Sequence, residues 1–161
     1  MKPMTPKGEE FFRDAPEIVR ASVAVRATPE RIFGALANAR SWERWFPLMR
    51  ECAWLEGATG GIGAEREVNL LALGRYREKM IVWEENARFA FTIVASSGSM
   101  AEAATEDFQI QSDGPKSSIV SWQFAASPRA WVKPALPLMR LGMTRLFLAS
   151  GPRLEKYLHQ S

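Results

Sequence analysis

The sequence predicts an α+β fold in which a curved, seven-stranded antiparallel sheet wraps around a long C-terminal helix. Segments that alternate apolar and polar residues follow one another from residue 17 to about residue 124. A tract rich in Leu and Met, from about Trp131 to Leu158, then closes the chain. Alternation is typical of half-buried strands, and the closing tract has helical spacing. Because a sheet curved around a helix leaves space between the two, the sequence indicates a container.

Length and composition fit one domain, with 161 residues, 47% of them hydrophobic. We expect residues 1–16, which are rich in proline, to form a loose N-terminal leader, and residues 17–161 to form the domain. Cys52 is the single cysteine, so an internal disulfide is excluded. No apolar signal or membrane-spanning segment is visible, which favours a cytoplasmic protein without stable membrane insertion. The net charge of +3 is scattered, so nucleic-acid binding is not expected.

The first elements are a strand and two short helices. Val19, Val23 and their neighbours alternate within the strand at Glu17–Arg26. Thr28 is then a candidate N-cap for a helix from Pro29 to about Ala39. Ser41 is a second candidate N-cap, for an aromatic-rich turn that Pro47 ends.

Six more strands are expected after these helices. The glycine-rich connection at residues 57–63 lacks the spacing of a phosphate-binding loop. Alternation places Tyr76, Glu78, Met80 and Val82 on the inner face of their strand. The predicted strands are Cys52–Glu56, Ala64–Leu71, Arg75–Trp83 and residues 89–93, 104–110 and 118–124.

The closing helix has a broad apolar arc, as expected for a helix held by a curved sheet. Gly151 and Pro152 interrupt its pattern, and we expect them to kink or break it.

Aromatic and sulfur-containing side chains on the inner face and on the helix are candidates for lining a ligand pocket. The alternative is that they fill an ordinary core. Two of them, Trp45 and Phe46, would lie at the mouth of the pocket. The candidate ligand-binding residues are Trp45, Phe46, Tyr76, Met80, Phe91, Phe108, Trp122, Phe124, Met139 and Met143.

Polar residues on the inner face are the candidates for chemistry. Glu78 and Glu106 would have raised pKa values in an apolar cavity and could act as acid or base, with Tyr76 as a further candidate. Arg66 is their potential counter-ion, or it simply pairs with Glu78 as a structural ion pair. His159 is the only histidine and lies near the C-terminus, so neither a catalytic triad nor a metal site is expected.

Several strings carry a family resemblance. Residues 27–33, ATPERIF, resemble the entry to the first helix in the bacterial polyketide cyclase/dehydrase-like branch of the START/Bet v 1-like (SRPBCC) superfamily. Residues 42–47, WERWFP, resemble its "W..W.P" segment, and residues 77–84, REKMIVWE, resemble its fourth strand. The order of elements is similar to the helix-grip fold of that superfamily. Glu85-Asn86 and Gly151-Pro152 depart from the family pattern.

The resemblance implies a cavity for lipids, sterols, isoprenoids or polyketides, and some members catalyse cyclisation or dehydration. We expect binding or transport of a small hydrophobic ligand, a lipid, isoprenoid or aromatic polyketide, without a cofactor. The alternative is a cyclase/dehydratase-like enzyme that uses the inward carboxylates. A second alternative is a structural or interaction module with an exposed apolar patch around Ile81 and Trp83. The chain would be a monomer or a homodimer.

Overall fold

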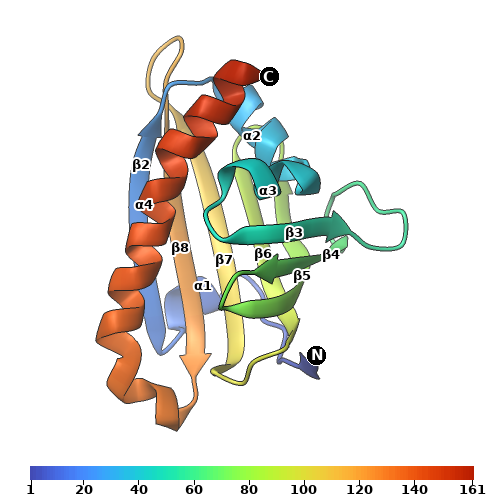
Figure 1. Ribbon diagram of the computed structural model, residues 1–161, viewed down its shortest axis with the longest axis vertical. Coiled ribbons are helices and arrows are strands. Elements are labelled where there is room, and N and C mark those ends of the chain that lie inside the picture. Colours follow the sequence, from blue (N-terminus) through green and yellow to red (C-terminus); the bar gives the residue numbers. More distant parts are fainter.

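A curved antiparallel sheet lies against one long helix in the computed structural model, which describes residues 1–161 (Figure 1). Seven strands run in the order β2-β8-β7-β6-β5-β4-β3, and the two-residue strand β1 pairs with β6. The predicted helix-grip architecture with seven main strands is therefore confirmed. The strands are β1 (Lys2–Pro3), β2 (Glu17–Val25), β3 (Met49–Trp54), β4 (Glu65–Leu70), β5 (Gly74–Glu84), β6 (Arg88–Ser96), β7 (Ala101–Ser112) and β8 (Ser118–Pro128).

Two short helices follow β2, as predicted, but their capping differs from the expectation. Thr28 makes no side-chain capping hydrogen bond. Ser41 lies inside a 3-10 turn, where its hydroxyl donates to the Ala35 carbonyl at 2.6 Å.

None of the helices combines the length and the apolar character needed to span a membrane. The helices are α1 (Phe11–Asp14), α2 (Pro29–Ala37), η1 (Ala39–Ser41), α3 (Trp42–Trp45), η2 (Ala130–Ala135) and α4 (Leu136–Gln160).

Helix α4 packs most closely on the sheet through its C-terminal half. Its buried residues begin at Phe147 and continue to Leu158. Gly151 sits so close to β2 that an added Cβ would lie 2.5 Å from Val23 Cγ2. The predicted interruption at Gly151-Pro152 was wrong, because the helix is continuous through both residues. Pro152 is exposed to solvent, and Gly151 permits the close approach to β2.

A β-bulge in β5 reverses the predicted faces of its last residues. Met80 pairs with Phe91 and Val82 pairs with Ala90, so Ile81 is the extra residue. Val82 therefore packs on the outer face, and Trp83 points inward against Phe89 at a centroid distance of 5.4 Å. The expected exposed patch around Ile81 and Trp83 does not form.

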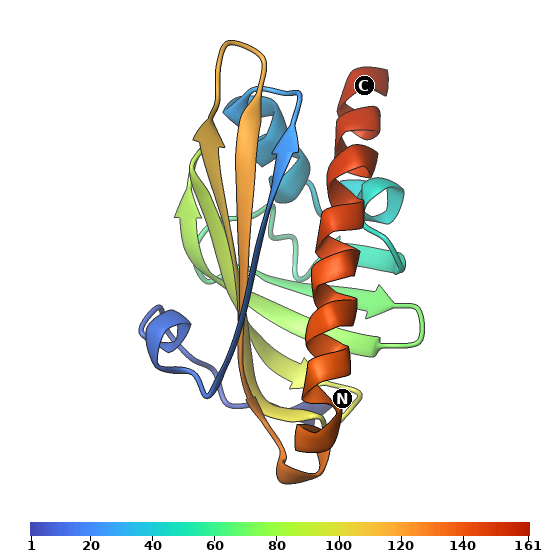
Figure 2. The ribbon, with the colours of Figure 1, turned by 90° about the vertical axis from the view of Figure 1, so that its left-hand side faces the viewer.

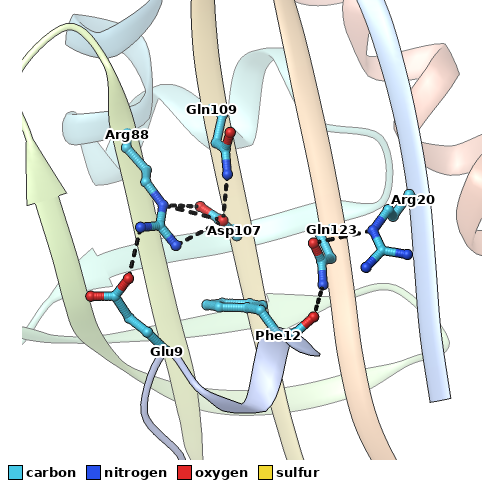
Figure 3. A network of polar contacts seen from close by, with 7 residues as sticks. All are labelled: Glu9, Phe12, Arg20, Arg88, Asp107, Gln109 and Gln123. Atoms are coloured by element: carbon cyan, nitrogen blue, oxygen red, sulfur yellow. Dashed lines mark hydrogen bonds and ion pairs between the residues drawn. The ribbon is translucent and has the colours of Figure 1, made fainter. Parts of the chain in front are cut away.

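The N-terminal segment lies on the outer, convex face of the sheet. Phe11 and Phe12 of α1 are buried there against small residues of β6, β7 and β8. A polar network holds the segment in place (Figure 3): Arg88 donates both to Asp107, at 3.0 Å, and to Glu9, at 2.7 Å. The segment thus covers one face of the sheet and leaves the concave face to α4.

Candidate functional site

A cavity of about 190 Å³ lies between the concave face of the sheet and the N-terminal half of α4. Of its 29 lining residues, 22 are hydrophobic. Helix α4 has no buried residue before Phe147, and the side chains of its first three turns that face the sheet line the cavity. In Figure 2 this part of α4 runs beside the sheet and parallel to its long axis.

Seven of the ten predicted ligand-binding residues line this cavity. They come from β5, β6, β8, α4 and the residue that follows α3, which converge on the same space although they are distant in sequence. These residues are Phe46, Tyr76, Phe91, Trp122, Phe124, Met139 and Met143.

The other three, Trp45, Met80 and Phe108, do not line it but belong to the packed core. Trp45 was expected at the mouth, yet it is 2% exposed and its indole N–H donates to Ser41 Oγ at 3.0 Å. Phe108 packs edge-on against Trp42 at a centroid distance of 5.6 Å. Helices α2 and α3 close one end of the sheet, and their side chains fill the space beside Met80 and Phe108.

A buried ion pair forms part of the cavity wall. Arg66 of β4 and Glu78 of β5 are direct cross-strand partners, and Arg66 Nε donates to Glu78 Oε2 at 2.6 Å. The Arg66 guanidinium carbon lies 4.4 Å from the centroid of the Trp42 ring and 5.1 Å from that of Phe91. Its two terminal nitrogens have no hydrogen-bond partner in the protein. The cation is therefore stabilised by one carboxylate and by aromatic faces, and the N–H groups of its two terminal nitrogens have no acceptor.

Burial affects the pKa values of both members of this pair. It raises the pKa of Glu78 above the usual carboxyl value, and the neighbouring Arg66 limits that rise. Burial by itself disfavours the charge of Arg66, but the Glu78 carboxylate, together with smaller contributions from Cys52 and Glu106, raises the pKa of the guanidinium, which stays protonated. The cavity wall thus holds a permanent cation at Arg66.

Glu106 of β7 is the second inward carboxyl group. Trp122 Nε1 donates to its Oε2 at 2.9 Å, and the remaining exposed surface of Glu106 faces the cavity. Burial and, to a smaller degree, the charge of Glu78 raise the pKa of Glu106 to about 7. Burial likewise raises the pKa of Tyr76, whose hydroxyl donates to the Leu73 carbonyl at 2.7 Å. The cavity therefore contains a carboxyl group that is poised to exchange a proton near neutral pH.

An ion pair that the sequence did not reveal joins α4 to the edge of the sheet. Arg140 donates to both carboxylate oxygens of Glu17, with 2.7 Å from its terminal nitrogen to Oε2, and both residues line the cavity. The only sequence signal was Arg140 itself, a charged residue among the apolar positions of the helix that face the sheet. Its partner lies 123 residues away, and a separation of that size leaves no local pattern.

The remaining reactive side chains form no second site. No group of three or more His, Cys, Asp or Glu residues is arranged to hold a metal ion. Cys52 is fully buried, and burial raises the pKa of its thiol to about 11. His159 Nδ1 lies 2.8 Å from the Glu155 carbonyl on the helix surface.

Comparison with known proteins agrees with this architecture. Residues 16–159 match the family described as polyketide cyclase / dehydrase and lipid transport. An uncharacterized protein of Mycobacterium tuberculosis is 30% identical over 149 residues, which cover 90% of this chain and 89% of that one.

Solved structures share the fold at low sequence identity. A START superfamily protein from Mycobacterium smegmatis superposes with a TM-score of 0.73 at 17% identity, over 89% of this chain and 97% of that chain. An aromatase/cyclase from Streptomyces sp. R1128 gives 0.71 at 12% identity, over 89% and 94% of the respective chains. The chain therefore belongs to the polyketide cyclase / dehydrase and lipid transport family.

Proposed function

We propose that this protein binds a small hydrophobic molecule in the cavity between the sheet and α4. The observation that carries the proposal is the cavity itself, of about 190 Å³ with a wall that is mostly hydrophobic. An apolar cavity of about 150 Å³ is large enough to take up benzene. A ring-sized group or a folded aliphatic chain fits such a space, in keeping with the lipid-transport and polyketide activities that the family description names.

The polar residues of the wall suggest the chemistry of the ligand. Arg66 offers unpartnered N–H donors beside the cavity, and Glu106 can donate when it is protonated. A ligand with an apolar body and an oxygen-bearing end would use both features. Lipids, isoprenoids and aromatic polyketides with a carboxylate, carbonyl or hydroxyl end all have this character.

Native mass spectrometry of the freshly purified protein tests the proposal. We expect a co-purified hydrophobic molecule on the wild-type chain and its loss in an Ala104→Phe variant, because Ala104 lines the cavity and a phenyl ring would fill it. Ala149→Phe, on the exposed side of α4, is the matched control and should keep the ligand. Equal occupancy of both variants would contradict binding in this cavity.

A second function, acid–base catalysis of a cyclisation or dehydration, is favoured by Glu106. Its pKa of about 7 and its position in the cavity wall suit a general acid or base, with Arg66 to stabilise a developing enolate oxygen. The aromatase/cyclase with the same fold supports this reading by analogy only.

Turnover of β-hydroxy ketones of graded size tests the catalytic function. Glu106→Gln should lower kcat by about 100-fold or more if the carboxyl transfers the proton. The wild-type rate should change with an apparent pKa near 7. If Glu106→Gln and Glu78→Gln both keep full turnover, these carboxyl groups are not the catalyst.

A further inference from the structure

Exposed hydrophobic side chains gather on one side of the molecule. Nine large ones are exposed, and seven of these lie in η2, in α4, in the β4–β5 turn or, for Leu48, directly before β3. Figure 2 shows α4 and the β4–β5 turn on the same side. We call the group on η2 and α4 the apolar face: Trp131, Leu138, Leu141 and Leu148.

The apolar face is directed away from the cavity. Leu138, Leu141 and Leu148 follow one another at intervals of three and seven residues, which places them on one side of α4. Met139 and Met143 line the cavity from the opposite side. The helix is thus apolar on two sides over its first half, and only one of these sides is used by the fold.

The charge of this part of the chain has a single sign. Five basic residues and no acidic residue occur between Arg129 and Leu154. Arg129 and Arg140 are paired with Glu102 and Glu17, whereas Lys133 and Arg145 are exposed and have no acidic partner. Exposed leucine and tryptophan side chains among unpaired basic residues are typical of segments that lie in the surface of an anionic bilayer.

We propose that the apolar face docks on the surface of an anionic phospholipid bilayer, with α4 lying along it. A second copy of the chain fits less well, because a two-fold interface would bring the same basic surface against itself. An anionic bilayer supplies both the charge and the apolar layer that the face lacks. The docking surface stands apart from the cavity, so it does not depend on which ligand the cavity holds.

Co-sedimentation with vesicles tests the docking surface. We expect wild-type protein to sediment with phosphatidylcholine vesicles that contain phosphatidylglycerol, and much less with phosphatidylcholine alone. Lys133→Glu with Arg145→Glu should weaken binding by at least about fivefold for each residue. Leu138→Gln with Leu141→Gln should also weaken it. Ile62→Gln is the matched control, since Ile62 and Leu138 are both 73% exposed but Ile62 lies in the β3–β4 loop.

Three outcomes would overturn the proposal. The first is the absence of sedimentation with anionic vesicles. The second is an equal loss of binding in Ile62→Gln and in the leucine variant. The third is a dimer in solution that the leucine variant dissociates while vesicles bind neither form, which would assign the face to self-association. Ligand content by native mass spectrometry should stay unchanged in the leucine variant, so a failure here is distinct from a failure of the cavity proposal.

Discussion

Arg66 and Glu78 face each other across β4 and β5 as an ion pair, with 0% and 7% of their side chains exposed. Removing one partner leaves the other charge buried without compensation. We expect Arg66→Met to lower the free energy of unfolding by about 3–5 kcal/mol. Arg66→Met combined with Glu78→Leu should recover most of this loss, as measured by urea denaturation. Purely additive losses in the double variant would mean that the two side chains are not coupled.

The raised pKa of Glu106 predicts that the stability of the protein depends on pH. Its pKa rises from 4.5 to about 7 on folding, so between these values the folded state binds more protons than the unfolded state. Stability is therefore highest at low pH in this window and falls as pH rises from about 4.5 to about 7, by up to about 3 kcal/mol.

Glu106→Gln isolates this effect, because the amide keeps an acceptor for the indole of Trp122 and does not titrate. The variant should be more stable than wild type at pH 8, with a flatter profile between pH 5 and pH 7 in thermal denaturation. Identical profiles for the two proteins would show that Glu106 has an ordinary pKa.

Gly151 makes possible the contact between α4 and β2. Gly151→Ala should cost about 1–3 kcal/mol, because the new Cβ would collide with Val23. Val23→Ala in the same chain should restore part of the loss. Gly142→Ala is the control in the same helix: nothing lies within 4 Å of its added Cβ, and we expect a gain of about 0.5–1 kcal/mol. A loss at both glycines would point to helix geometry rather than to this contact.

The ion pair between Arg140 and Glu17 joins the N-terminal half of α4 to β2 at the cavity. We expect Arg140→Ala to lower the free energy of unfolding by about 1–3 kcal/mol, because Glu17, whose side chain is 6% exposed, loses its ion-pair partner. Hydrogen–deuterium exchange should become faster for residues 136–146 and stay unchanged for residues 150–158. Uniform acceleration along the helix would contradict a local role.

The sequence predicted those features of the fold that depend on local periodicity. Alternation placed Glu106, Phe108 and Trp122 on the inner face, because β7 and β8 pair in regular register through this region. It failed at Val82, because a bulge shifts the pattern by one residue without a mark of its own. The predicted helix break at Gly151 also failed, because Gly151 allows the helix to approach β2 closely and does not interrupt it.

The candidate site was partly predictable for the same reason. Arg66, Tyr76, Glu78 and Glu106 were identified from strand alternation, and all four line the cavity. Periodicity cannot distinguish a residue that lines a cavity from one in a filled core, so Phe108 was misplaced with them. That distinction depends on where α2, α3 and α4 pack against the sheet, which is a property of the whole fold.

The most direct test of the cavity is the NMR spectrum of protein labelled at its methionine methyl groups and titrated with decanoate. Met139 and Met143 line the cavity, whereas Met80 is packed in the core and Met1 is exposed on the surface. We predict saturable shifts of the Met139 and Met143 signals, with Met1 and Met80 unaffected. Shifts that are absent, or that are as large at Met1 as at Met139, would contradict ligand binding between the sheet and α4.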